Sequence, residues 1–228
     1  STGDFLGAID AVPVALDALD ELLDIPGLFV FGSNDYYAPR IKNPFSYLTP
    51  DRGKRIHGDP LPSHDLADGL TKRGWNNLNF SRAMLKINDS VIEARGTDDA
   101  HHNRDDYSLV AGKPDSAADV AIGVTHAPYK RIIEAMKEDG LSAIFAGHTH
   151  GGQVRLPWIG GSRALTTNCD LPTWRARGLT RFGREPWLHV SAGMGTSPFA
   201  HIRVASPPEV SLVTLTQRRV NHSSDERF

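Results

Sequence analysis

The stretch from residue 119 to residue 146 constrains the fold more than any other part of the sequence. Residues 119–125 have the composition of a buried strand, residues 129–139 have helical spacing and stop at Gly140, and residues 141–146 have a second strand pattern. A strand, a helix and a strand in this order predict a right-handed βαβ unit with parallel strands. We therefore expect an α/β protein built on a sheet with parallel strands.

The rest of the chain fits the same alternation. Apolar residues spaced by three and four predict a helix over residues 12–23 with Asp10 as its N-cap. Residues 28–31 are typical of a buried strand, and residues 63–73 of a helix that ends before Gly74. The other strand patterns predict a hairpin followed by a series of short strands, at 83–87, 91–94, 187–191, 202–205 and 210–216.

Composition limits the class of protein. The chain has 228 residues, with 25 Lys and Arg against 27 Asp and Glu, so no global positive charge favours a nucleic-acid groove. The single cysteine, Cys169, excludes an internal disulfide. We expect one domain over residues 1–216 and a polar tail over residues 217–228. The first residues carry no signal-peptide pattern, which favours a cytoplasmic location or a peripheral one at the cytoplasmic membrane.

Side chains that can bind metals stand at four points where strands are expected to end. They are Asp4, the group Ser33-Asn34-Asp35, His126, and the pair His148 and His150. Because the carboxyl ends of parallel strands meet at one edge of a sheet, these side chains are expected to converge. Carboxylate, amide and imidazole groups together suit a divalent metal ion.

Each of these groups also has a purely structural explanation. A Gly-Asp pair such as Gly3-Asp4 is usually a surface turn, and a single histidine after a strand, such as His126, is usually a hydrogen-bonded polar residue. The run from Gly147 to Gly152 is different, because two imidazoles one residue apart between glycines have few structural uses. The occurrence of all the groups in this order strengthens the metal interpretation.

That order resembles the calcineurin-like metallophosphoesterase family, whose signature is D-x-H, G-D, G-N-H, a histidine and G-H-x-H. The matching residues are Gly3-Asp4, Gly32-Ser33-Asn34-Asp35, His126 and Gly147-His148-Thr149-His150. The resemblance extends into Thr125-His126-Ala127-Pro128 and Gly151-Gly152-Gln153, which look like those of a bacterial subgroup of membrane-associated phosphodiesterases. The resemblance implies two packed mixed β-sheets flanked by helices, and hydrolysis by attack of a metal-bound hydroxide.

The resemblance also implies the metal ligands. Asp4 would bridge two divalent ions, which can be Mn, Fe or Zn. One ion would take Asp4, an amide from the motif at 32–35, His126 and His148. The other would take Asp4, His150 and the two residues of a D-x-H motif. Only three residues precede Asp4, so we expect an N-terminally truncated fold that binds one metal ion. With half of the second site absent, the sequence is compatible with both an active enzyme and an inactive chain.

The motif at residues 32–35 departs from the family pattern. Strict alignment gives Ser33 as the metal ligand, whereas a shift of one residue gives Asn34. We favour Asn34, because an amide oxygen is a better ligand than a neutral hydroxyl. In either case no histidine stands in the motif, so the family's usual leaving-group acid is absent. Substrates with good leaving groups are therefore expected.

Three more residues are candidates for binding the substrate. The stretch 97–102 resembles a D-D-x-H segment of the subgroup, so either His101 or a carboxylate of Asp98-Asp99 that supports the ligands is expected near the metals. A solvated loop explains the stretch equally well. Arg175 and Arg177 can hold a phosphate through their guanidinium groups. A plain surface loop is the simpler explanation for both arginines.

Three functional hypotheses follow from the sequence. The first is a metal-dependent phosphoesterase acting on phosphodiesters, with lipid-linked ones suggested by the resemblance and membrane association only through a missing N-terminal segment. The second is a degenerate module that keeps the fold and one metal ion but binds or regulates without catalysis. The third, a zinc-dependent amide hydrolase, lacks support because the chain has no H-E-x-x-H motif.

Overall fold

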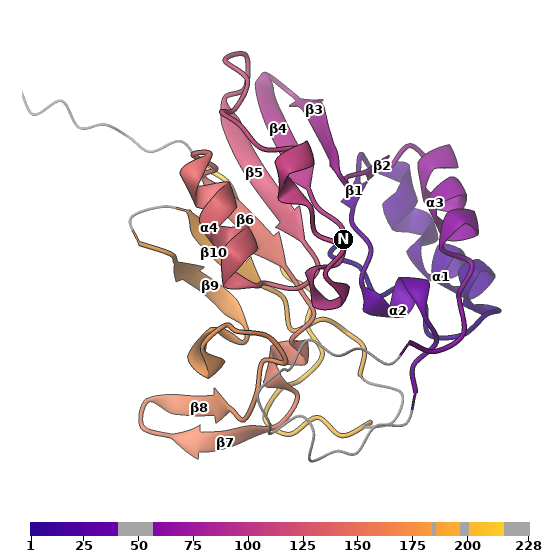
Figure 1. Cartoon of the computed structure of the whole chain (residues 1–228), viewed down its shortest axis with the longest axis vertical. Helices are drawn as coiled ribbons and strands as arrows, with labels where there is room; N and C mark the ends of the chain where they lie inside the picture. The colour runs from indigo at the N-terminus through magenta and orange to yellow at the C-terminus, as the bar shows by residue number, and fades with distance from the viewer. Residues whose placement is uncertain (41–56, 184–185, 197–200, 217–228) are drawn as a thin grey trace, which may run out of the picture.

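Helices and strands alternate along the chain in the computed structural model, which describes residues 1–40, 57–183, 186–196 and 201–216 (Figure 1). The α-helices are α1 (Ala11–Leu19), α2 (Ser33–Tyr36), α3 (Ser63–Lys72) and α4 (Lys130–Glu138). The strands are β1 (Leu28–Phe29), β2 (Asn76–Asn77), β3 (Ser81–Ile87), β4 (Ser90–Gly96), β5 (Val120–Thr125), β6 (Ala143–Ala146), β7 (Arg155–Trp158), β8 (Gly161–Ala164), β9 (Gly178–Arg181) and β10 (Trp187–Val190). The 3₁₀ helices are η1 (Asp20–Asp24), η3 (Ala100–His102), η4 (Tyr107–Leu109), η5 (His150–Gly152) and η6 (Thr173–Arg175).

A six-stranded mixed sheet with the order β3-β4-β5-β6-β10-β9 forms the centre. β4, β5, β6 and β10 run parallel, whereas β3 and β9 are antiparallel to their neighbours. β5, α4 and β6 form the βαβ unit that the sequence predicts. Ala121 of β5 packs in a buried cluster with α4, while Ile122 and Val124 pack in a cluster on the opposite face. Burial on both faces explains the continuous apolar run of β5.

A second, two-stranded parallel sheet of β1 and β2 packs on the central sheet. Val30, just after β1, shares a buried cluster with Ala94 of β4 and Ile122 of β5. Phe29 and Phe31 pack in a separate cluster with residues of α1 and α3. The order of layers is therefore α1 and α3, the small sheet, the central sheet, and α4 (Figure 1). The predicted α/β class, with packed sheets flanked by helices, is confirmed.

Several expected elements are confirmed with small changes at their ends. The helix predicted at 63–73 is α3, and the hairpin predicted at 83–94 is formed by β3 and β4 in antiparallel register. The helix predicted at 12–23 is α-helical only to Leu19 and continues as the 3₁₀ helix η1. Asp10 occupies the N-cap position, but its side chain makes no capping hydrogen bond.

Two predicted strands near the C-terminus are wrong. Within the described residues, 202–205 contributes only an isolated bridge between Val204 and Val154, and 210–216 contains no strand. Val210 and Leu212 are 76% and 98% exposed. Their alternating apolar pattern therefore has no neighbouring strand or core on which to pack, and periodicity alone does not make a sheet.

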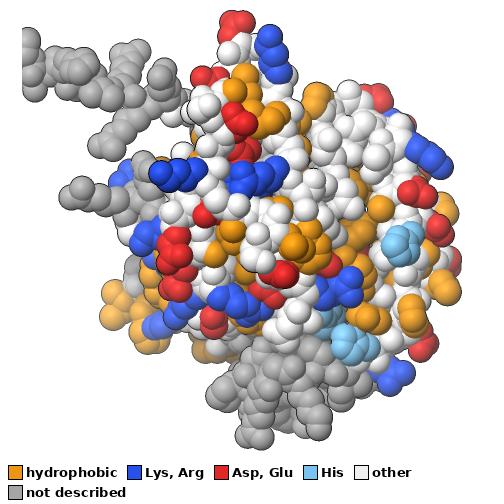
Figure 2. Space-filling view, turned by 45° about the horizontal axis from the view of Figure 1, so that its top comes forward, with side chains coloured by type: hydrophobic (Ala, Val, Ile, Leu, Met, Phe, Trp, Pro, Cys, Tyr) orange, Lys and Arg blue, Asp and Glu red, His pale blue; other side chains and the backbone are white. Residues whose placement is uncertain are grey.

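The described part of the chain contains no helix that is both long and apolar enough to span a membrane. The polar tail predicted at 217–228 lies outside the described residues. On the face shown in Figure 2, basic and acidic side chains are intermingled, so this face carries no field of one sign. That distribution agrees with the formal net charge of −2.

Candidate metal centre

The candidate ligands lie at the carboxyl ends of neighbouring parallel strands. β5 ends at Thr125 and is followed directly by His126, and β6 ends at Ala146, two residues before His148. Because β5 and β6 pair in parallel, both histidines leave the central sheet at the same edge. The N-terminal segment reaches this edge too, since the carbonyl of Thr2 lies 2.7 Å from His126 Nδ1.

Asp4 is held by the loop that follows β1. Its carboxylate accepts hydrogen bonds from the backbone N–H of Asn34 at 2.8 Å and from Asn34 Nδ2 at 2.9 Å. The backbone of Asp4 has a φ of 62°, in the left-handed region that residues other than glycine rarely adopt. Gly32 leaves the space that this arrangement needs, because a Cβ there would meet Asp4 Oδ1 at 2.3 Å and His126 Cε1 at 2.4 Å.

Asp35 fixes the turn at Asp4 from inside the protein. Its buried carboxylate accepts four backbone N–H groups, at 2.7 to 3.0 Å, from Asp4, Phe5, Leu6 and Gly32. Burial and the Asp4 carboxylate raise the pKa of Asp35 to about 7, although the N–H groups act in the opposite direction. With both oxygens engaged by the backbone, Asp35 positions Asp4 and leaves the metal to other residues.

His126 and His148 turn one nitrogen outward to the backbone and one toward each other. The outward contacts are His126 Nδ1 with Thr2 O and His148 Nε2 with Asn168 O, the latter at 3.1 Å. A carbonyl can only accept, so both outward nitrogens carry the proton in the neutral rings, and both inward nitrogens present a lone pair. The inward pair, His126 Nε2 and His148 Nδ1, lies 3.2 Å apart, and His126 Nε2 is 3.5 Å from Asp4 Oδ2.

Three acceptor atoms therefore lie close together. Asn34 Nδ2 already donates to Asp4 Oδ2, so the unfavourable contact is the one between the two inward nitrogens, and a proton or a metal cation there would relieve it. Burial and the neighbouring His126 lower the pKa of His148 to about 4. Burial also lowers the pKa of His126, but the carboxylates of Asp4 and Asp99 outweigh it and raise that pKa above its usual value. The cluster thus attracts positive charge at His126 and keeps His148 neutral, the form that binds metals.

The separations of these atoms match those of metal ligands. Two atoms bound to one ion at the distances usual for Zn or Mn occupy neighbouring positions about 3.0–3.5 Å apart. The pairs at 3.2 and 3.5 Å fall in this range. No group of three or more His, Cys, Asp or Glu in the described ranges is already arranged as a finished metal-binding set. The chemistry of these donors suits a divalent ion, because nitrogen and oxygen groups meet around His126 Nε2.

Comparison with known proteins decides the family. The family model described as calcineurin-like phosphoesterase matches residues 1–152, which include Asp4, His126, His148 and His150. The chain belongs to the calcineurin-like phosphoesterase family. The resemblance inferred from the sequence motifs is confirmed, and the strand ends that carry them are those of a calcineurin-like fold.

The calcineurin-like chain is similar to three curated bacterial proteins. It is 27% identical to the uncharacterized protein YpbG of Bacillus subtilis over 175 residues, which cover 73% of this chain and 58% of YpbG. It is 38% identical over 74 residues to the UDP-2,3-diacylglucosamine pyrophosphatase LpxG of Chlamydia trachomatis, covering 31% of this chain and 22% of LpxG. With the LpxG of Chlamydia muridarum the identity is 34% over 85 residues, covering 36% and 25% of the two chains. The chain thus spans a little over half of YpbG and about a quarter of the LpxG proteins.

One solved structure is also similar. A putative 5'-nucleotidase from Staphylococcus aureus, in complex with alpha-ketoglutarate, has a TM-score of 0.43 and 12% identity. The superposition covers 95% of this chain and 46% of the nucleotidase.

Within the calcineurin-like site, Asn34 and Ser33 have different surroundings. Asn34 Nδ2 contacts Asp4 Oδ2, and a half-turn of the amide would bring its oxygen to the same place beside Asp4. Ser33 Oγ instead donates to Asp99 Oδ2 at 2.8 Å. His102 Nδ1 lies 2.9 Å from the same oxygen. The Asn34 amide therefore lies beside Asp4, whereas the Ser33 hydroxyl is engaged by Asp99.

His150 lies on the turn η5, and its contacts are with the C-terminal segment. Its Nδ1 is 3.1 Å from the carbonyl of Gly195. Its own carbonyl accepts from Arg203 Nη2 and Ser206 Oγ, both at 3.1 Å. Burial lowers the pKa of His150, and the charge of Asp4 acts in the opposite direction. The charge of Asp4 therefore acts on His150, and the contact of Nδ1 with the Gly195 carbonyl holds the imidazole in place.

The three predicted substrate-binding residues have different positions. His101 is buried and packs on His148, with ring centroids 4.5 Å apart, so the structure brings it to the site. Arg177 lies beside the η5 turn, where its Cδ would be 3.5 Å from a Cβ on Gly151. Arg175 is engaged elsewhere. Its guanidinium stacks on Trp174 at 4.4 Å and donates to the carbonyl of Arg181, at the end of β9, at 2.8 Å.

Sequence reasoning missed the groups that orient the ligands. The carbonyl of Thr2 has no sequence signature, because any residue supplies one. Asn168 has a φ of 55° and holds His148 through its carbonyl, and an asparagine in a loop is only a weak signal. Asp99 was not missed in this way, because the D-D-x-H segment already indicates a carboxylate near the metals, and Asp99 follows the end of β4 at the same sheet edge. Although burial acts against it, His102 and His126 hold the pKa of Asp99 well below its usual range.

Proposed function

We propose that this protein hydrolyses phosphoester bonds with a divalent metal ion held by Asp4, Asn34, His126 and His148. The observation that carries the proposal is the convergence of Asp4 Oδ2, His126 Nε2 and His148 Nδ1, three acceptor atoms within 3.5 Å of a neighbour. Membership of the calcineurin-like phosphoesterase family supports the same reaction class. The family generally depends on divalent metals, and nitrogen with oxygen ligands suits Mn, Fe or Zn.

The substrate class that we propose is a phosphodiester or a pyrophosphate attached to a lipid. Two relatives are named as pyrophosphatases of UDP-2,3-diacylglucosamine, a molecule that carries both a pyrophosphate and two acyl chains. Their similarity covers about a third of this chain, so it supports the class of bond more than the identity of the lipid. His101 and Arg177, beside the candidate ligands, are the residues that we propose for contact with the phosphate.

The residues of this chain have separate tasks in such a reaction. Thr2 and Asn168 orient the two imidazoles, so that His126 and His148 present lone pairs inward. Asp35 holds the turn of Asp4 through backbone N–H groups, which keeps that carboxylate next to His126. When bound, the metal ion lowers the pKa of a water molecule and neutralises phosphate oxygens.

We further propose that one metal ion binds tightly and that His150 belongs to a weaker second site. His150 shares the electrostatic environment of Asp4 but is anchored to Gly195. If elemental analysis found two stoichiometric metal ions that resist dialysis, this part of the proposal would be wrong.

The test combines metal content with turnover. Hydrolysis of bis-p-nitrophenyl phosphate is measured with added Mn²⁺ for the wild-type chain, for His148→Ala, and for His64→Ala as a matched control on the exposed face of α3. We expect His148→Ala to lose metal binding and turnover together, and His64→Ala to keep both.

The degenerate module remains the competing hypothesis, and the same assay separates the two. It predicts that the chain binds a metal ion through His148 but shows no hydrolysis, either alone or with additional upstream residues. Turnover that survives His148→Ala would instead contradict the assignment of the site.

A further inference from the structure

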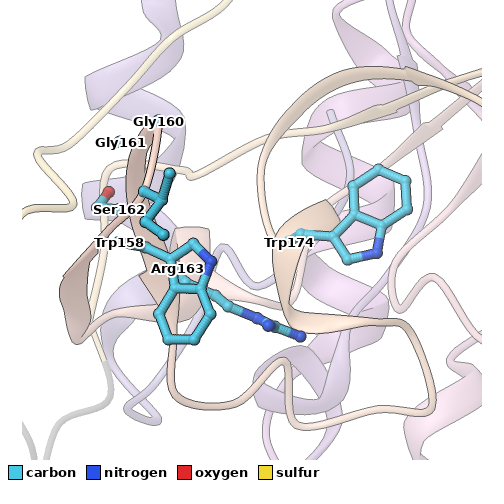
Figure 3. A pocket seen from close by; sticks show the side chains of 7 residues that line it. Trp158, Gly160, Gly161, Ser162, Arg163 and Trp174 are labelled. Atoms are coloured by element: carbon cyan, nitrogen blue, oxygen red, sulfur yellow. The ribbon is translucent and has the colours of Figure 1, made fainter.

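The β7–β8 hairpin presents an exposed apolar tip. Trp158 is 61% exposed and Ile159 is 96% exposed, at the turn between the two strands. Trp174 of η6, which is 53% exposed, lies across an open cavity of about 240 Å³ from Trp158 (Figure 3). Arg163 Nε donates to Thr173 Oγ1, which ties the hairpin to η6. These residues form one continuous surface, which we call the hairpin surface.

The charge of this region differs from that of the whole chain. Residues 154–183 contain five arginines and a single acidic residue, Asp170, whereas the chain has a net charge of −2. Arg155 is buried, and the other four arginines are exposed or partly exposed. Two of the arginines lie on the exposed indoles. The Arg163 guanidinium is 5.3 Å from the Trp158 ring centroid, and that of Arg175 is 4.4 Å from Trp174. Indoles flanked by arginines suit the boundary between lipid headgroups and acyl chains.

We propose that the hairpin surface docks on a bilayer that contains anionic lipids. Trp158 and Ile159 would enter the interface, and the exposed Arg163 would contact lipid phosphates. This partner fits the positive charge of residues 154–183. It also fits the shape of the hairpin, because a protruding turn with Gly160 and Gly161 at its end can penetrate a soft interface, whereas protein partners usually receive such anchors in preformed pockets.

Docking would place the candidate metal centre beside the membrane. The hairpin begins just after the η5 turn that carries His150, and Arg155 Nη1 donates to the carbonyl of Gly151 at 2.9 Å. A lipid-attached phosphoester would then reach the site without leaving the bilayer. Membrane docking itself does not depend on catalysis, so it can be tested even if the proposed hydrolysis fails.

The experiment measures co-sedimentation of the chain with vesicles. One set is pure phosphatidylcholine, and the other contains about 30% phosphatidylglycerol. We expect binding to the anionic set at low salt and weaker binding at high salt. Ile159→Asp should reduce the bound fraction about tenfold, because a charged side chain replaces an inserted apolar one. Ile9→Asp is the matched control, since Ile9 is 74% exposed and lies next to α1, away from the hairpin (Figure 1).

Two further variants identify the surface that binds. Asp4→Asn should bind vesicles like the wild type, because asparagine also adopts left-handed φ values and the metal centre is not part of the docking surface. Quenching of tryptophan fluorescence by brominated lipids should be lost when Trp158 and Trp174 are both changed to Phe.

Three results would overturn the inference. They are equal binding to both vesicle sets, unchanged binding of Ile159→Asp, and loss of binding in Asp4→Asn, which would move the lipid contact to the metal centre. A concentration-dependent dimer that Ile159→Asp dissociates, without any vesicle binding, would assign the surface to a second copy of the chain and would also overturn it.

Discussion

Gly32 offers the sharpest test of how the candidate metal centre is built. Its backbone has φ −112° and ψ −178°, a conformation that alanine adopts without strain. The site has no room for the alanine Cβ, because it would lie 2.3 Å from Asp4 Oδ1 and 2.4 Å from His126 Cε1, where at least 3.0 Å is needed. Both candidate ligands would have to retreat by more than about half an ångström, which exceeds the tolerance of about 0.2 Å in metal–ligand distances.

Gly32→Ala should therefore weaken metal binding more than it weakens the fold. Overpacking a buried position costs about 1–3 kcal/mol of stability. We expect metal affinity to fall about 10–100-fold, the size of effect seen when the support of ligands is disturbed. Titration calorimetry with Mn²⁺ or Zn²⁺ measures the affinity, and urea unfolding of the metal-free protein measures the stability.

Gly7→Ala is the matched control. A Cβ at Gly7 meets nothing within 4 Å, so this variant should bind metal like the wild type and be equally or slightly more stable. The reasoning would be refuted if Gly32→Ala bound metal with wild-type affinity while remaining folded, because Asp4 and His126 would then not both be ligands.

Three other predictions follow from contacts described by the structure. Asn34→Ala should lower metal affinity about tenfold or more, whereas Ser33→Ala should leave it nearly unchanged. If Ser33 is the ligand instead, calorimetry of the two variants would show the large loss of affinity in Ser33→Ala. Arg95→Met should cost about 3–5 kcal/mol in urea unfolding, because it removes the hydrogen-bonded ion-pair partner of the buried Glu93 and leaves only the more distant Arg82. Arg73→Met, which breaks only exposed ion pairs, should shift the midpoint little. Removing metal with EDTA should lower the midpoint of thermal unfolding. Mn²⁺ or Zn²⁺ should restore the midpoint, and Mg²⁺ should restore it less. A midpoint that does not change with metal would argue against a bound ion.

The layers of the fold were predictable where local pattern and burial agree. β5 is apolar on both faces, α4 has helical spacing, and the α3 helix ends before a glycine, so each element carries its own signal. The pairing of β1 with β2 had no sequence signal, because β2 consists of only two residues, Asn76 and Asn77, and both are polar. The C-terminal strands failed for the opposite reason, since Val210 and Leu212 have the pattern of a strand but no partner.

The candidate metal centre was predictable in its side chains but not in its support. Asp4, His126 and His148 follow strand ends, and the topology of a parallel sheet brings such positions together. The carbonyls that orient the imidazoles come from Thr2 and Asn168, and no residue type announces a backbone carbonyl. The motif at residues 32–35 lacks the histidine that is usual in the family. In the structure, the amide of Asn34 lies beside Asp4.

Arg203 links parts of the chain that are made at different times. Its guanidinium donates to the carbonyl of His150, 53 residues earlier, and to those of Ala192 and Gly195. During synthesis the central sheet up to β6 can assemble while the segment around Arg203 is still within the ribosome. The His150 turn then lacks the hydrogen bonds from Arg203, so this corner of the site acquires its final shape only after the segment around Arg203 has left the ribosome.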